Sequence, residues 1–393
     1  MFIVFKNIKS KIRKHKIFIY ALLHSIMLLI VVNIFANSSF SFGEERRLIH
    51  TYNLIVEYLG WDKENLDSEA FLIDVSYDSR MIPIFDEYGM PMGDGVITDR
   101  NKLYRILSDL RQTNTYKYII FDIHIDPELK TDFDTLLIDE INAMDRIVVP
   151  YHKDSSNPLI SLSKKGFADY TIMFSKSDFS KYTFVEDGIP SMAERLYEEL
   201  YDVESPENCC GFLITEEGLA YSKLLIRLPI QYKNRYNEQG ELVIHSLGTD
   251  VLNSYTTELL SEAVKDKIVV LGSFWESDIH STYVGDMSGP LLHLNAYHAL
   301  VRGEHFIHWG LQIAMFVLFF VISLFLFNVV NADIFTTLLH NRFWVFAISF
   351  VGYSTILFLF SMICFLLTGQ VVEIMMLSLW FSIVQFTKNH IFR

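Results

Sequence analysis

Long apolar runs constrain this chain more than any other feature of its sequence. Residues 17–36, IFIYALLHSIMLLIVVNIFA, carry no formal charge over twenty positions, and residues 306–330 and 343–368 are comparably apolar. A helix needs about 20 such residues to cross roughly 30 Å of hydrocarbon. A fourth run, 371–387, is shorter and contains Glu373. These runs predict four transmembrane helices, one N-terminal and three C-terminal.

Basic residues predict the orientation of these helices. Residues 1–16 hold six lysines and arginines and no acid, which by the positive-inside rule keeps this N-terminus in the cytoplasm. Four spans then return the short tail 388–393 to the cytoplasm and leave 37–305 outside, periplasmic or extracellular. A cleaved signal peptide is the alternative for 1–36. The long apolar run and the poor cleavage sequence FANSSF favour an uncleaved anchor in the inner membrane.

Charge limits the partners of the outer segment. Residues 37–305 contain 45 aspartates and glutamates against 24 lysines and arginines, an excess of 21 negative charges. Such a surface argues against nucleic acid or anionic lipid as a ligand. About 270 residues can bury one large core, and no linker or internal repeat divides them. We expect one folded domain, with the lipid bilayer as partner of the four spans.

Alternating apolar runs and amphipathic stretches predict the fold of this domain. Strands are expected at 70–75, 117–123 and 146–150, separated by a helix that Thr98 or Asp99 opens and by a second helix at 132–144. Strand, helix, strand, helix, strand is typical of parallel crossovers. The fold class is therefore α/β, a sheet with parallel crossovers flanked by helices, plus the four membrane helices.

The later part of the domain gives weaker patterns. Its expected elements are strands at 168–174, 241–245 and 266–273, helices at 190–201, 250–264 and 290–301, a turn-rich segment at 86–95 and a loop at 274–288. The helix at 290–301 leads almost directly into the second span.

Several polar groups could carry chemistry, and each has a simpler interpretation. Asp122, His124 and Asp126 share one strand face and, with Asp74, could chelate a divalent metal. Strand-end carboxylates more often cap helices or hold loops. Asp278 with His280 could form an acid/base pair, and Ser76 could act as a nucleophile.

No catalytic motif accompanies these groups. The sequence contains no G-x-S-x-G, H-E-x-x-H or phosphate-binding glycine loop. Four histidines, His293, His298, His305 and His308, match no standard metal-ligand spacing. We therefore expect no cofactor, no metal and no enzymatic activity. Adjacent Cys209 and Cys210 favour two ordinary thiols over a redox pair.

A ligand crevice has better physical support. Open α/β sheets bind ligands outside the carboxyl ends of their strands. Asp74, Ser76, Asp122 and the loop after Gly272 would meet at that edge. These residues could contact a ligand or only brace the fold.

A set of spaced polar residues near the end of the domain carries a resemblance. The matching residues are Asp74, Ser76, Arg100, Asp122, the stretch 267–272, Asp278, His280, Thr282, Gly285, Gly289, His293, Asn295, Ala296, Leu300, Arg302 and Gly303. In this pattern and in its order of spans, the chain resembles the type 2 CHASE domain, an extracytoplasmic sensory domain associated with cyclases and histidine kinases. The resemblance implies a sensory function for 37–305.

Two departures from that family are visible. The family's Trp-Pro-Trp segment before the helix arginine is replaced by GVITDR at 95–100. Members typically continue into a cytoplasmic effector domain, whereas only KNHIFR, 388–393, follows the last span here. We therefore expect a stand-alone sensor that signals to a separate effector protein.

Three functions remain as hypotheses. The first is a membrane-anchored sensor that binds a small ligand or an exported protein and shifts between two packings, and a homodimer is expected on general signalling grounds. The second is a scaffold that docks an exported partner. The third is an exported metal-dependent hydrolase, which metal content and Asp122→Ala would test.

Overall fold

The computed structural model describes residues 2–38, 44–59, 70–86, 88–154, 156–169, 181–209, 211–231, 245–275, 278–327 and 342–391. The chain divides into two compact units. The membrane unit comprises Met1–Leu59, Gly218–Leu225 and Phe306–Arg393, and the sheet unit comprises Gly60–Glu217 and Ile226–His305. The predictions for Cys210, for the 331–341 connection and for strand residues 170–174 and 241–244 lie outside the described residues.

A six-stranded, wholly parallel sheet forms the centre of the sheet unit. Its strands, in spatial order, are β14 (His245–Gly248), β1 (Ala70–Asp74), β15 (Ile268–Gly272), β4 (Tyr118–Asp122), β5 (Ile147–Tyr151) and β6 (Lys165–Phe167). The mixed α/β class with parallel crossovers is therefore confirmed. The late strand β15 lies between β1 and β4, so Asp74, Gly272 and Asp122 are in register at one edge.

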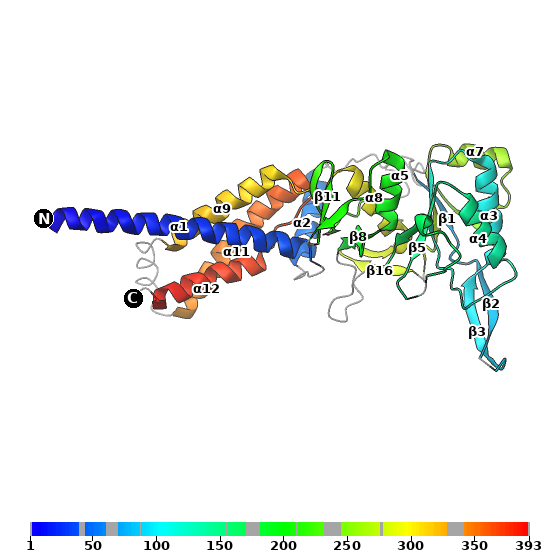
Figure 1. Ribbon diagram of the computed structural model, residues 1–393, viewed down its shortest axis with the longest axis horizontal. Coiled ribbons are helices and arrows are strands. Elements are labelled where there is room, and N and C mark those ends of the chain that lie inside the picture. The colour runs from blue at the N-terminus through cyan, green and yellow to red at the C-terminus, as the bar shows by residue number, and fades with distance from the viewer. Residues whose placement is uncertain are drawn as a thin grey trace. The chain divides into compact units, whose positions relative to one another are not determined.

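Helices cover both faces of this sheet. The first face packs against α3 (Arg100–Thr113), α4 (Asp134–Ala143) and α7 (Thr257–Val264), and the second against α5 (Met192–Tyr201) and α8 (Gly289–Val301) (Figure 1). Strand side chains alternate between the faces: Phe71 and Ile73 belong to the core under α3, whereas Leu72 between them is fully buried outside that core. Burial on both faces explains the continuous apolar strand sequences.

The boundaries of α3 follow local chemistry. Asp99 is the N-cap, and its side chain accepts a hydrogen bond from Asn101 N at 2.9 Å. The helix ends at Asn114, which adopts the left-handed conformation with φ 50°. Leu103, Ile106, Leu107 and Leu110 are buried, as their spacing predicted.

Three expectations for connecting segments were wrong. The helix predicted at 250–264 is two helices, α6 (Thr249–Leu252) and α7, because the Thr256 side chain accepts from Leu259 N and starts a new helix. The loop predicted at 274–288 contains a hairpin, β16 (Ile279–Thr282) and β17 (Gly285–Ser288). Most of the turn-rich segment 86–95 belongs to a second hairpin, β2 (Ser79–Phe85) and β3 (Pro91–Thr98).

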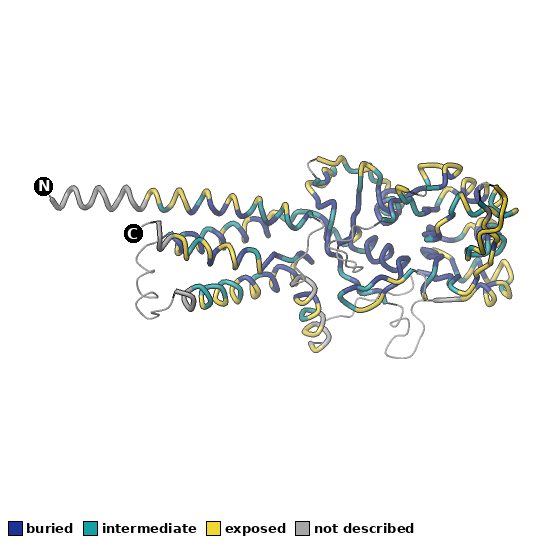
Figure 2. Tube along the Cα trace, turned by 90° about the horizontal axis from the view of Figure 1, so that it is seen from below, coloured by how far each residue is buried: buried dark blue, intermediate teal, exposed yellow. Residues whose placement is uncertain are grey.

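The β2–β3 hairpin projects from the sheet unit (Figure 1), and Figure 2 shows it largely exposed. Its exposed apolar side chains are Met81, Ile84, Met90, Met92 and Val96. The remaining short elements are η1 (Leu162–Lys164), β7 (Tyr182–Thr183), β8 (Val185–Glu186), β9 (Ile189–Pro190), β10 (Glu207–Cys209), β11 (Phe212–Thr215), β12 (Gly218–Tyr221) and β13 (Lys223–Leu224).

The membrane unit is helical. Its helices are α1 (Phe2–Ala36), α2 (Glu44–Leu59), α9 (Trp309–Phe327), α11 (Arg342–Thr368) and α12 (Met375–Ile391). By length and composition, three stretches of the described chain could cross a membrane: His15–Ala36, Trp309–Phe327 and Phe346–Thr368. The apolar part of α12, Met375–Thr387, is shorter. A multi-pass membrane protein with one N-terminal and at least two C-terminal spans is thus supported.

Polar side chains join α1, α9 and α12 inside this unit. His24 Nδ1 lies 2.8 Å from Ser323 Oγ, and Trp380 Nε1 donates to His24 Nε2 at 2.8 Å. Asn33 Nδ2 donates to Gln312 Oε1 at 2.8 Å, about two helical turns from His24. Hydrogen bonds between neutral side chains hold membrane helices in one register, since breaking them in lipid leaves polar groups unpaired.

Candidate functional site

A cavity of about 630 Å³ opens at the carboxyl edge of the parallel sheet. Its walls come from the segments that follow β4, β5, β6 and β15, together with Arg100 of α3, Tyr182 of β7 and the start of α8. This volume suits a small molecule, and the position is where open α/β sheets place ligands. Its lining contains four aspartates and one arginine.

Asp122 is the most unusual group in this cavity. It is the last residue of β4, its side chain is 10% exposed, and its Oδ2 atom is buried with no hydrogen-bond partner among the described residues. His293 Nε2 lies 3.6 Å from this oxygen, too far for a good hydrogen bond. A buried polar atom left in this state costs free energy, which a ligand could recover.

Tyr182 fixes the orientation of His293. The Tyr182 hydroxyl accepts from the backbone N–H of Ala193 and lies 2.6 Å from His293 Nδ1, to which it can donate its own hydrogen. In that arrangement the neutral His293 carries its proton on Nε2, facing Asp122. The chain Ala193, Tyr182, His293 and Asp122 therefore runs from α5 through β7 and α8 to the sheet edge.

Burial favours the uncharged forms of both groups in this contact. Desolvation, followed by the nearby Asp278 carboxylate, raises the pKa of Asp122 well above its usual range. Desolvation also lowers the pKa of His293 to about 4. These shifts favour the protonated carboxyl of Asp122 and the neutral imidazole of His293.

Asp278 supplies a second carboxylate on the same wall. Its Oδ1 lies 2.9 Å from His280 Nε2, and Gly289 N donates to its backbone carbonyl at 2.9 Å. A Cβ atom at Gly289 would lie 2.0 Å from Asp278 Oδ2. Only glycine lets α8 begin this close to the carboxylate. The expected acid/base pair of Asp278 and His280 is therefore present as a contact in the cavity wall.

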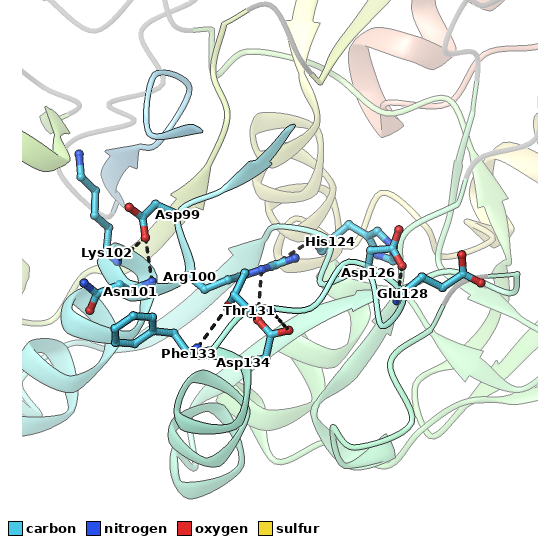
Figure 3. Close-up of polar contacts among 10 residues, drawn as sticks. All are labelled: Asp99, Arg100, Asn101, Lys102, His124, Asp126, Glu128, Thr131, Phe133 and Asp134. Carbon is cyan, nitrogen blue, oxygen red and sulfur yellow. Dashed lines mark hydrogen bonds and ion pairs between the residues drawn. The ribbon is translucent and has the colours of Figure 1, made fainter. Parts of the chain in front are cut away.

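Arg100 is a buried cation in the cavity lining, and Figure 3 shows its polar contacts. Its side chain is 2% exposed, Nη1 donates to the His124 carbonyl at 3.4 Å, and Nε lies 3.8 Å from Asp134 Oδ1. Burial lowers the pKa of Arg100, but Asp134 and Asp126 oppose this effect and the guanidinium stays charged. Arg100 thus connects α3 to the loop after β4 and to the start of α4.

Two histidines lie at the ends of neighbouring strands. The rings of His124 and His152 meet edge to face with centroids 5.0 Å apart, and His152 Nδ1 lies 2.6 Å from Asp169 Oδ1. Burial, then the neighbouring His152, lowers the pKa of His124. This pair lines the cavity, but among the described residues it forms no hydrogen bond or ion pair with Asp122, although β4 and β5 adjoin.

The other sequence-predicted residues brace the surrounding structure. Asp74 Oδ1 accepts from Ser76 N at 2.9 Å, and Ser76 Oγ accepts from Phe274 N at 2.9 Å and from Trp275 N at 3.1 Å, which ties β1 to the segment after β15. This engagement leaves Ser76 poorly placed as a nucleophile. Asp74 and Ser76 do not line the cavity.

Gly272, Thr282 and Asn295 also lie outside the cavity lining. A Cβ atom at Gly272 would lie 2.5 Å from Pro290 Cγ, so glycine permits the approach of α8 to β15. Thr282 Oγ1 donates to Gly285 O at 2.6 Å and closes the β16–β17 turn. Asn295 is fully buried and bonds to the backbone of Ile230.

No group of three or more His, Cys, Asp or Glu side chains among the described residues is arranged to hold a metal ion. The four clustered histidines separate: His293 lines the cavity, His298 and His305 do not, and His308 belongs to the membrane unit.

Sequence reasoning missed three cavity residues, Tyr182, His152 and Asp169. His152 follows the third strand directly, so the rule that selected Asp74 and Asp122 would also have found it. No sequence signal indicates Tyr182, because its role depends on the tertiary approach of β7 to α8. Comparison with protein-family models, curated proteins and solved structures found no match.

Proposed function

We propose that the chain is a membrane-anchored sensor whose sheet unit binds a small ligand outside the cytoplasm and signals through its membrane helices to a separate effector protein. The observation that carries this proposal is the cavity at the sheet edge, with the buried, unpartnered Asp122 Oδ2 in its wall. Membrane helices in the same chain supply a route for the signal. The proposal includes four transmembrane helices and a cytoplasmic location for both termini of the chain.

Chain connectivity supports a mechanical link. His293 is part of α8, and only the seven residues 302–308 separate α8 from α9. A ligand that binds one position of α8 better than another would shift the populations of two states by its differential affinity. The change would reach the contact of α9 with α1, where the rings of Phe18 and Phe320 lie 5.2 Å apart.

Two linked measurements test this function. First, a collection of small polar molecules is screened for thermal stabilisation of the full chain in lipid nanodiscs. Ala168→Trp, which fills the cavity, should abolish stabilisation, whereas Ala143→Trp at an exposed position of α4 should not. Second, cysteines at Phe18 and Phe320 are cross-linked with and without each binding compound. Equal cross-linking in every case would contradict a sensor.

The β2–β3 hairpin favours a second candidate, a scaffold that docks an exported protein. Its exposed methionines form an adaptable apolar surface of the kind that binds partners. Copurification with one stable partner, without any ligand-dependent cross-linking change, would favour this candidate.

A further inference from the structure

The charge balance of the cavity indicates the chemistry of its ligand. Among the described residues, its lining includes Asp122, Asp126, Asp169 and Asp278 and one arginine, Arg100, which already pairs with Asp134 outside the lining. Asp126 and Asp169 also have partners, since Asp126 Oδ1 accepts from Glu128 N and Asp169 accepts from Lys153 N. Asp278 Oδ1 likewise contacts His280 Nε2, so Asp122 Oδ2 is the buried acceptor that lacks a hydrogen-bond partner among the described lining residues, with the Asp278 carboxylate nearby.

Apolar side chains lie beside these carboxyl groups. Ile123 follows Asp122, Leu292 precedes His293, and Phe167 ends β6, and all three line the cavity. A ligand that satisfies this wall needs a cationic hydrogen-bond donor at one end and an apolar body at the other.

We propose that the cavity binds a small organic ammonium ion, with its nitrogen between Asp122 Oδ2 and Asp278 and its hydrocarbon part against Ile123, Phe167 and Leu292. This inference rests on the proposed ligand-binding function and names the ligand class. The ammonium group replaces the proton of the Asp122 carboxyl, and that proton leaves to solvent. His293 Nε2–H then donates to the ionised carboxylate, which completes the chain from Tyr182.

Three probes of nearly equal shape test the charge requirement: n-butylammonium, 1-butanol and butyrate, each titrated into the full chain in nanodiscs and followed by ligand-observed NMR. Butylammonium has five non-hydrogen atoms, so we expect a Kd on the order of 1 mM. The other two probes should bind at least about tenfold more weakly, because only a cation is attracted electrostatically to the Asp122 and Asp278 carboxyl groups.

Variants locate the binding group. Asp122→Asn should weaken butylammonium binding by about tenfold or more and leave the unfolding temperature unchanged or higher, because asparagine resembles the protonated carboxyl. Asp126→Asn is the matched control, since Asp126 lines the same cavity, and it should change the Kd by less than about threefold.

Proton displacement predicts the pH dependence. The groups that face Asp122 are His293 of α8, Asp278 and His280 before and within β16, and Tyr182 of β7. The affinity for butylammonium should rise with pH, by up to about tenfold per pH unit while Asp122 is protonated in the free protein, because each binding event then releases one proton from Asp122.

Several results would overturn the inference. Tighter binding of butyrate or butanol, an unchanged Kd in Asp122→Asn, a pH-independent Kd, or displacement of butylammonium by micromolar Zn²⁺ bound at the same residues would each do so. If butyrate or butanol binds more tightly, the cavity still binds a ligand, so the proposed function is not contradicted. If neither these probes nor any compound of the wider screen binds, and cross-linking of α1 to α9 never changes, both the ammonium inference and the proposed sensor function are contradicted.

Discussion

Several titratable side chains of this protein are buried, and burial favours their uncharged forms. Asp122, Glu194 and His293 are all at least nine-tenths buried, and within the described part of the chain none forms an ion pair shorter than the 3.6 Å contact of Asp122 with His293. For each, desolvation is the largest cause of its pKa shift, and it favours the uncharged form. The chain therefore holds several neutral titratable groups within one unit, and its stability must depend on pH.

Glu194 provides the clearest test of this dependence. Burial, then the nearby Glu198, raises its pKa to about 8, so folding favours the protonated form. The stabilising contribution of its protonated form is complete below the pKa of the unfolded state, near 4.5, and is lost as pH rises through 8. Above pH 8, Glu194→Gln should therefore be more stable than the wild type by roughly 5 kcal/mol in free energy of unfolding, with a higher unfolding temperature, and it should equal the wild type near pH 4.5.

The measurement is thermal unfolding of both proteins between pH 4.5 and 9. Glu216→Gln, at an exposed position, is the control and should follow the wild-type curve. A constant difference between Glu194→Gln and the wild type at all pH values would show that Glu194 does not titrate in this window.

At the scale of elements, α8 is the most constrained helix. Glycines at 272 and 289 let it approach β15 and Asp278, and His293 brings it to the cavity. Its burial is nearly complete around its circumference, which explains why its sequence shows no amphipathic pattern. Asn295 then fastens the helix to the segment at Ile230.

Replacing Asn295 tests this attachment. Its Oδ1 accepts from Ile230 N at 3.0 Å and its Nδ2 donates to Ile230 O at 2.9 Å, both fully buried. Asn295→Ala should lower the free energy of unfolding by about 2–4 kcal/mol, since two buried backbone groups lose their partners. Asn142→Ala removes similar bonds to Leu159 and Ser161 at an exposed site and should cost less than about 1 kcal/mol. If denaturant unfolding showed that both variants lose the same free energy of unfolding, the stronger effect expected for the buried Asn295 would be contradicted.

At the scale of the whole molecule, membrane topology decides what the cavity can sense. By the positive-inside rule the basic residues of 1–16 predict a cytoplasmic location for that end, and an odd number of spans between it and the sheet unit would then put the cavity outside. The described helices are compatible with this orientation and with its reverse, so labelling must distinguish the two.

Cysteine labelling tests the topology directly. Cys209 is exposed in the sheet unit, and a Cys210→Ser, Cys364→Ser background removes the other thiols. In spheroplasts, a membrane-impermeant maleimide should label Cys209, whereas a cysteine at Ser10, in a chain also carrying Cys209→Ser, should react only after permeabilisation. The opposite pattern would invert the topology and exclude an extracytoplasmic sensor.

Prediction from sequence succeeded where local patterns carry the information. The strands at 70–75, 117–123 and 146–150 and the Asp99 cap depend on neighbours in the chain, and the structure has them within a few residues. The helix at 250–264 was wrong because the Thr256 cap interrupts an otherwise helical pattern. In the site, strand-end Asp122 was predictable from its position, whereas Tyr182 was not.

The sequence by itself determined the membrane helices, the α/β class and the polar groups at the strand ends, because apolar length, periodicity and capping are local properties. Tertiary structure alone decided that β15 enters between β1 and β4, which brings Gly272 beside Asp122 and lets α8 lie against both. The same insertion places His293 and Asp278 near Asp122. A lone strand-end carboxyl thereby becomes a buried group in a cavity with a raised pKa, since this pKa depends in part on Asp278, more than 150 positions away in the chain.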